Sequence, residues 1–190
     1  AWELSGGFIV LKDDEVLHES VYGFEDRVDM RPMTMNSKYL LHTESAFLVG
    51  LSIFLLIDQG KLKLTDRMSR FIPEYQYADQ ISLKHLIKSQ SGISDYFYNH
   101  LMIDLNKDAS YLDLSDHDKA RMEQKTHAQN RHFEKVMRII GDVELAYAPG
   151  TTGRSGSESN WVFLAEIVRR VSGLSLFNFL DQHVFKPLNM

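Results

Sequence analysis

The N-terminal part of the chain has a pattern of apolar and polar residues that predicts a β-hairpin. Two β-rich runs, Gly7–Leu11 and Val16–Tyr22, are separated by the polar cluster Lys12-Asp13-Asp14-Glu15. Runs of this length, joined by residues that favour a tight reversal, are typical of two antiparallel strands. This hairpin is the sheet that the pattern predicts most clearly.

From Asn36 onward the pattern predicts helices. The first, Ser45–Gln59, carries apolar residues around almost its whole circumference, which predicts burial on all sides. Gly60 follows directly, and glycine readily adopts the left-handed conformation that ends many helices. We therefore expect a buried helix that stops at Gly60.

Two short helical segments are expected next. Thr65 or Asp66 can cap a turn that stops before Pro73, because either side chain can accept a hydrogen bond from a first-turn N–H group. Ser82 can cap Leu83–Lys88 in the same way. The pattern thus predicts small helices carried on loops.

The rest of the chain is also expected to be mainly helical. The polar stretch Asn106–Asn130 is interpreted as helical, and the amphipathic segment Phe133–Ile140 follows it. Apolar residues recur at helical spacing over Trp161–Val171, and Gly173 closes that helix. A last helix is expected over Leu176–Val184.

Composition and charge limit the classes of protein and partner. With 190 residues, 44% of them hydrophobic, the chain can bury one substantial core, so we expect a single domain over 1–190. A net charge of -5 without a dense basic run excludes nucleic acid and anionic membrane surfaces as partners. The longest apolar run, Ala46–Ile57, is shorter than the ~20 residues that a membrane span needs.

No cofactor or metal site is expected. The chain has no cysteine, which excludes disulfides, thiol nucleophiles and Cys-based metal sites. His117, His127 and His132 lack the i, i+4 spacing that places two ligands on one helix face, and no carboxylate motif accompanies them.

The cellular compartment stays open. The absence of cysteine fits the cytosol and an oxidising compartment equally well. The first residues, Ala1–Leu4, show no charged and apolar export segment. We expect an extracytoplasmic protein if an export signal was removed, and a cytoplasmic one otherwise.

Short motifs spread along the chain share an order and a spacing. In that order they resemble the class C β-lactamase and DD-peptidase family, a group of serine hydrolases that also contains esterases. The resemblance implies an α/β (α+β) fold of the β-lactamase/transpeptidase type, with an N-terminal hairpin and a mostly helical region. The matching segments are Tyr22–Arg27, Asp58–Leu62, Ile81–Ile93, Ala148–Thr151, Ser159–Leu164, Val171–Gly173 and Phe185–Met190.

The resemblance implies a Ser-x-x-Lys motif at the start of the first long helix. Counting back from Gly60 places the serine position at Thr43 and the lysine position at Ala46. A hydroxyl is a weak nucleophile at neutral pH until a neighbouring base takes its proton, and Ala46 supplies no base. Losing such a base typically costs ~10²–10⁴ in rate. We therefore expect an impaired hydrolase.

Two further motifs of the family are also not intact. Counting back from Asn160 places the tyrosine of a Tyr-x-Asn motif at Gly156 and its asparagine at Glu158. The third motif, a Lys- or His-containing triad on a late strand, would follow Met190. We therefore expect a domain truncated at its C-terminus, with the late sheet strands absent from this chain.

Other side chains could replace the missing base, but each has a simpler role. His42 and Glu44 are the nearest ionisable residues, yet neighbours along a helix start generally point elsewhere. Glu158 could act only if its loop carried it to Thr43, and a carboxylate at that point also favours the start of the following helix. Thr43 itself could be an ordinary helix N-cap.

Two groups of residues near these motifs have both a structural and a functional interpretation. Ser89 and Ser91 lie in a loop that shapes the pocket rim in the family, but turn capping explains them without chemistry. Tyr96, Phe97 and Tyr98 line a cleft or pack beneath it.

Three functions follow from these residues. The first is a β-lactamase-related serine hydrolase homologue with a degraded site, whose ancestral substrates are β-lactams, peptidoglycan peptides or small esters. The second is a non-catalytic ligand-binding or scaffolding module that uses the retained cleft for a small molecule or peptide. The third is an active enzyme that uses Thr43 with an unrecognised base.

The hairpin predicts a partner. A two-stranded hairpin alone is marginal in water, and in the resembling family later strands pair with it. We expect either a homo-oligomer or a complementing chain to cover its edge and apolar face.

Overall fold

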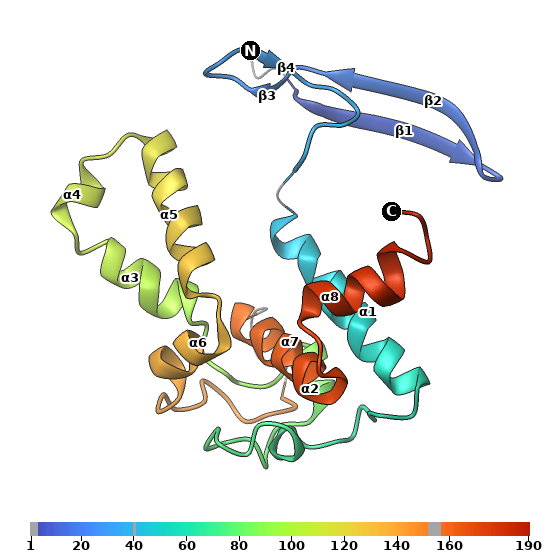
Figure 1. Cartoon of the computed structure of the whole chain (residues 1–190). Helices are drawn as coiled ribbons and strands as arrows, with labels where there is room; N and C mark the ends of the chain where they lie inside the picture. The colour runs from blue at the N-terminus through green and yellow to red at the C-terminus, as the bar shows by residue number, and fades with distance from the viewer. Residues whose placement is uncertain (1–3, 40, 152–156) are drawn as a thin grey trace. The chain divides into compact units, whose positions relative to one another are not determined.

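The computed structural model describes residues 4–39, 41–151 and 157–190. The chain divides into two compact units, Ala1–Thr43 and Glu44–Met190. The first unit consists of small antiparallel sheets and the second is helical (Figure 1). Each unit has its own internal structure.

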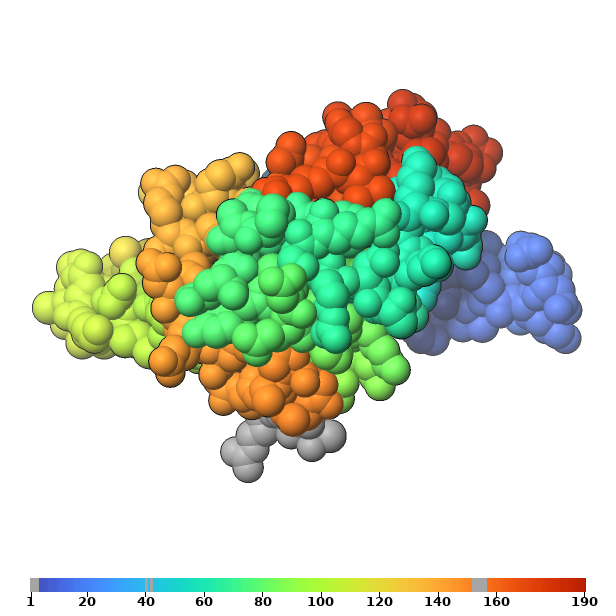
Figure 2. All heavy atoms as spheres, turned by 90° about the horizontal axis from the view of Figure 1, so that it is seen from below, coloured from blue at the N-terminus to red at the C-terminus, as the bar shows by residue number. Residues whose placement is uncertain are grey.

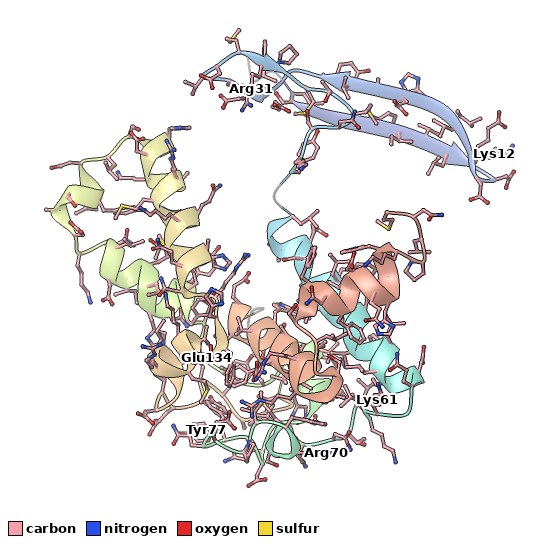
Figure 3. All side chains as sticks on the ribbon, in the orientation of Figure 1. Lys12, Arg31, Lys61, Arg70, Tyr77 and Glu134 are labelled. Atoms are coloured by element: carbon pink, nitrogen blue, oxygen red, sulfur yellow. The ribbon has the colours of Figure 1, made fainter. Side chains whose placement is uncertain are left out.

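The first unit confirms the predicted hairpin. Strands β1 (Gly6–Lys12) and β2 (Glu15–Tyr22) pair antiparallel, from Gly6 opposite Tyr22 to Lys12 opposite Glu15. The turn residues Asp13 and Asp14 have φ of 49° and 64°, a left-handed conformation that aspartate tolerates and that two-residue hairpin turns require. Figure 3 shows Lys12 at this turn end of the hairpin.

A second, smaller sheet follows, which the hydrophobic pattern did not predict. Strands β3 (Phe24–Asp26) and β4 (Arg31–Pro32) are joined by a turn that Asp26 closes. Asp26 Oδ1 accepts hydrogen bonds from the backbone N–H groups of Val28 at 2.9 Å and Asp29 at 3.1 Å. These bonds, with the nearby Arg31, lower the pKa of Asp26. Strands this short carry too few residues for an alternating pattern to be visible.

The apolar side chains of the hairpin are exposed within the first unit. Neither face of a two-stranded ribbon is covered by the ribbon itself, so side chains that alternate between the faces all remain in solvent. The exposed apolar residues of β1 and β2 are Phe8, Ile9, Val10, Leu11, Val16, Leu17 and Tyr22.

In the second unit, helix α1 (Ser45–Asp58) ends as expected, with Gly60 in the left-handed conformation at φ 70°. The prediction of burial on all sides was wrong. Phe47 is 71% exposed and Phe54 is 46% exposed, because α7 and α8 contact α1 along one face. The buried residues of α1 are Val49, Ser52, Ile53 and Leu56.

The short segments after α1 match their predicted places, and one of the two predicted caps is confirmed. Ser82 caps α2 (Leu83–Ile87): its Oγ accepts from His85 N at 3.2 Å, and His85 Nδ1 accepts from Ser82 N at 3.3 Å. Burial, with the charges of Arg67 and Lys84, lowers the pKa of His85, which keeps Nδ1 able to accept.

The predicted cap at Thr65 or Asp66 was wrong, although the turn exists. The 3-10 turn η2 (Met68–Arg70) begins after Arg67, whose side chain makes no capping bond. Asp66 instead closes the preceding turn, where Oδ2 accepts from Lys63 N at 2.9 Å. Figure 2 shows the segment between α1 and α2 spread across one face of this unit, bordered by the segment after α6 and by the C-terminal helices. Arg70 is labelled on this segment in Figure 3.

Helix α7 is the centre of the second unit. Phe163, Leu164, Ile167 and Val168 are all fully buried, and α7 contacts α1, α2, α6 and α8. The predicted helices at 133–140, 161–171 and 176–184 are confirmed, whereas the predicted helical stretch 106–130 is divided into two helices, α4 and α5, by residues 113–115. Their bounds, with the intervening short turns, are η3 (Phe97–Leu101), α3 (Met102–Leu105), α4 (Ala109–Leu112), α5 (Asp116–Asn130), α6 (Phe133–Ile140), α7 (Glu158–Ser172), α8 (Leu176–Leu180) and η4 (Asp181–Phe185).

An ion-pair network fixes the C-terminal half of α7. Glu166, 5% exposed, accepts from Arg169 Nε at 2.7 Å and from Arg170 Nε at 2.6 Å. Arg170 continues to the carbonyl of Phe71 at 2.7 Å and to the carboxylate of Glu74. Burial alone would raise the pKa of Glu166, but the bonds from the two arginines outweigh it, so that pKa lies below its usual value.

Replacing Glu166 with glutamine is expected to lower the free energy of unfolding by about 1–3 kcal/mol at neutral pH, because both arginines lose a charged acceptor. Since the folded-state pKa is lowered, the carboxylate stabilises the fold above the unfolded pKa near 4.5, and this contribution is lost as pH falls through the folded value. Urea unfolding from pH 7 to pH 3 measures both effects. Glu144→Gln, at an exposed loop position, is the matched control and should change little; equal losses would contradict the network's role.

Candidate active site

The two residues predicted for the Ser-x-x-Lys positions lie on consecutive turns at the start of α1. Thr43 belongs to the 3-10 turn η1 (His42–Glu44) and is exposed, whereas Ala46 is the second residue of α1 and is half-buried. The interpretation of Thr43 as N-cap was wrong. The capping position falls on Glu44, whose φ of −62° and ψ of −23° continue the helical winding from η1 into α1.

The residues predicted as substitute bases lie in different surroundings, and only some of them belong to the described part of the chain. Glu44 is exposed and makes no capping bond with its side chain. The side chain of His42 and the whole of Gly156 lie outside the described part of the chain. Glu158 is the first residue of α7, with its Oε2 4.0 Å from His127 Nε2. Its place in the first turn is one where a carboxylate favours the helix dipole.

A buried carboxylate that the sequence argument missed holds the start of α7. Asp95 is 8% exposed, and its Oδ2 accepts from Glu158 N at 2.6 Å. Its other oxygen, Oδ1, accepts from the N–H groups of Phe97 at 2.9 Å and Tyr98 at 2.7 Å, which begin η3. One side chain therefore caps two helical segments that are far apart in the sequence. The signal available was an aspartate directly before a helical stretch.

Two serines continue this connection between the loop before η3 and helix α7. Ser159 Oγ donates to the carbonyl of Ser94 at 2.7 Å and accepts from Tyr96 N at 3.0 Å. Ser91 Oγ donates to Asn160 Oδ1 at 2.5 Å and accepts from Ile93 N at 3.1 Å. The turn-capping interpretation of Ser91 is therefore confirmed.

The aromatic residues predicted to line a cleft or pack beneath it divide between the two roles. Tyr96 is fully buried and Phe97 is nearly so, whereas Tyr98 is exposed. The ring of His127 stacks on Tyr96 with centroids 6.0 Å apart and meets the edge of Phe97 at 4.9 Å. Burial, together with the charges of Glu158 and Asp95, raises the pKa of Tyr96, and its hydroxyl has no hydrogen-bond partner among the residues that the structure describes.

Outside this region the described residues offer few features of a metal site, a membrane span or a pocket. Over 4–39, 41–151 and 157–190, no group of three or more His, Asp or Glu side chains is placed to hold a metal ion. In the same part of the chain, the helices are too short or too polar to cross a membrane. A surface hollow along α5 is lined by Asp118, Arg121, Met122, Lys125, Thr126 and Gln129, none of which is a predicted site residue.

The small antiparallel sheets and the helices together belong to a β-lactamase/transpeptidase-like fold. A family model described as "Beta-lactamase" matches residues 2–190, and the chain therefore belongs to that family. Penicillin-binding protein 4* of Bacillus subtilis (strain 168) is 23% identical over 99% of this chain and 37% of its own length. Esterase EstB of Burkholderia gladioli is 25% identical over 96% of this chain and 44% of its own length.

A solved structure supports the fold. The octameric penicillin-binding protein homologue from Pyrococcus abyssi superposes with a TM-score of 0.72 at 20% identity, over 97% of this chain and 38% of that one. The chain thus spans less than half the length of these relatives. At this level of identity the likeness concerns the fold.

Changing Asp95 to asparagine tests the capping role. The amide oxygen can face either η3 or α7 but not both, so at least one buried N–H group loses its acceptor, at a cost of about 1–3 kcal/mol in unfolding free energy. Asp108→Asn is the matched control, because Oδ1 alone accepts from both Ser110 N and Ser110 Oγ at an exposed helix start. Chemical denaturation should separate the two variants; equal changes would show that the double capping is unimportant.

Proposed function

We propose that this chain is a homologue of the β-lactamase-related serine hydrolases whose inherited centre at Thr43 is catalytically impaired. The observation that carries the proposal is Ala46, which stands at the position of the family's lysine and has no ionisable group. Without a proton acceptor the hydroxyl of Thr43 stays protonated at neutral pH, and the loss typically costs ~10²–10⁴ in rate.

The second motif supports the same proposal. Gly156 stands at the tyrosine position and Glu158 at the asparagine position, so a hydroxyl and an amide are both replaced. Glu158 also has a structural role at the start of α7. Its backbone N–H group donates to Asp95, and its carboxylate faces His127. These contacts give Glu158 a reason to be present that requires no chemistry.

The relatives suggest which compounds to test. Their names include penicillin-binding proteins and an esterase. We therefore propose β-lactams, peptidoglycan peptides and small esters as the compounds that the inherited site recognises. Because the relatives are more than twice as long as the matched region, this chain has a counterpart of only part of each of them.

Intact-mass analysis after incubation with a reactive penicillin tests the impairment. The native chain is expected to gain no mass, because a ring-opening attack needs a deprotonated hydroxyl. The triple variant Thr43→Ser, Ala46→Lys, Gly156→Tyr restores the hydroxyl, amine and phenol positions and is expected to acylate more than the native chain. An adduct on the native protein that disappears in Thr43→Ala would contradict the proposal and favour an active threonine enzyme.

A ligand-binding module is the second candidate function. Within the described part of the chain, Tyr96 Oη and Ser157 Oγ are buried without hydrogen-bond partners. Buried polar groups of this kind are stabilised when a ligand satisfies them. Thermal unfolding with a muropeptide or a β-lactam separates this candidate from the first. A raised melting temperature with unchanged protein mass favours binding without chemistry.

We also propose that the chain associates with a second copy of itself through the exposed hairpin. The apolar side chains on β1 and β2 are unusually numerous for a free surface, and a lone two-stranded ribbon is marginal in water. The homologue from Pyrococcus abyssi is described as octameric, which is compatible with association in the family. A complementing chain is the alternative occupant.

Analytical ultracentrifugation at micromolar concentration tests the association. The native chain is expected to sediment as a species larger than a monomer, and Leu17→Lys is expected to shift it toward the monomer by placing a charge among exposed apolar residues. Lys12→Gln, at the hairpin turn, is the matched control and should leave the mass unchanged. A stable native monomer would rule out self-association and favour the complementing chain.

A further inference from the structure

A serine and a histidine lie within hydrogen-bonding distance at a place that corresponds to neither motif position. Ser94 Oγ is 3.1 Å from His100 Nε2, and both side chains are half-buried, so each remains accessible to solvent. His100 belongs to η3, which turns the chain back toward Ser94. A hydroxyl against an imidazole nitrogen is the arrangement that activates a serine nucleophile.

A neighbouring amide also contacts Ser94 Oγ. Asn99 Nδ2 lies 3.4 Å from this oxygen and donates to it. A hydroxyl has one proton and two lone pairs, so the bond from Asn99 leaves the Ser94 proton available to His100 Nε2 when the imidazole carries its own proton on Nδ1. In that tautomer the pair is oriented as nucleophile and base.

The backbone that carries Ser94 is fixed to the buried centre of the unit. The carbonyl of Ser94 accepts from Ser159 Oγ at 2.7 Å, and the next residue, Asp95, caps α7 through Glu158 N. Both connections end on α7, the most buried helix of the unit. A nucleophile on a segment held in this way keeps its geometry at little entropic cost during reaction.

We propose that Ser94 and His100 form an acyl-transfer centre of their own, independent of Thr43, which acts on small activated esters. Ser94 Oγ bonds to the ester carbonyl carbon while His100 Nε2 takes the hydroxyl proton. The carbon–oxygen bond to the leaving group then breaks, and that group departs with the proton from His100. Water, deprotonated by His100, attacks the acyl-serine, and the proton returns to Ser94 Oγ as the acid leaves.

The chemistry of the pair limits its substrates. Among the described residues, His100 Nδ1 has no carboxylate or other hydrogen-bond partner that would stabilise the imidazolium. A base without that support assists best when the leaving group needs little protonation, as in aryl esters, and assists poorly with amides. Asn99 is a positioning residue, and its amide is also a donor close to the place where an oxyanion would form.

The test uses the native chain with p-nitrophenyl acetate and with an alkyl fluorophosphonate, whose phosphorus–fluorine bond breaks as the serine oxygen attaches. Peptide mapping of acid-quenched samples is expected to locate the acetyl or phosphonyl group on Ser94. Ser94→Ala and His100→Gln are each expected to lower the background-corrected release of nitrophenol by about tenfold or more. Ser110→Ala and His132→Gln, at exposed positions, are the matched controls and should leave the rate unchanged.

The labelling of the native chain needs no variant, so the result does not depend on how well a mutant folds. A label on Ser94, with loss of rate in both variants, supports the centre. A label on Thr43 or on another residue, an absence of labelling, or a full rate in Ser94→Ala would overturn it. A label on Thr43 would also overturn the proposed impairment, whereas an absence of labelling would leave that proposal standing.

Discussion

The helical unit depends on how one buried carboxylate satisfies the starts of two helical segments. Asp95 accepts from three backbone N–H groups, two in η3 and one in α7. Buried N–H groups at a helix start cost free energy unless something accepts from them, and water is excluded here by Tyr96 and the core around α7. The loop before η3 and the central helix are therefore held together by the same side chain.

This arrangement places several reactive side chains close to the start of α7. Ser94 and Tyr96 lie on either side of Asp95, and both make backbone bonds to Ser159 on α7. His127 reaches the same place from α5, where its ring packs on Tyr96 and its Nε2 approaches Glu158. Chemistry at this place and chemistry at Thr43 draw on different residues, so the loss of one does not imply the loss of the other.

Several parts of the fold could be predicted from local patterns, because they depend on interactions between residues that are close in the sequence. The hairpin followed from two β-rich runs around two aspartates, and the ends of α1 and α7 followed from Gly60 and Gly173 in the left-handed conformation. Ser82 was predictable as a cap because its partner is three residues away. The exposure of Phe47 and Phe54 could not be predicted in this way. An apolar pattern indicates which side chains tend to be buried, but not whether another helix packs against them.

The distinction between local pattern and tertiary packing also applies to the chemistry of the chain. The assignment of Thr43 and Ala46 to the family's serine and lysine positions is a prediction from the order of residues alone, because those positions lie one helical turn apart. The roles of Asp95, Ser94 and His100 emerged only from the folded chain. Their contacts depend on where η3 turns and on which helix packs beside it, and these are set by the burial of α7 as a whole rather than by neighbouring residues.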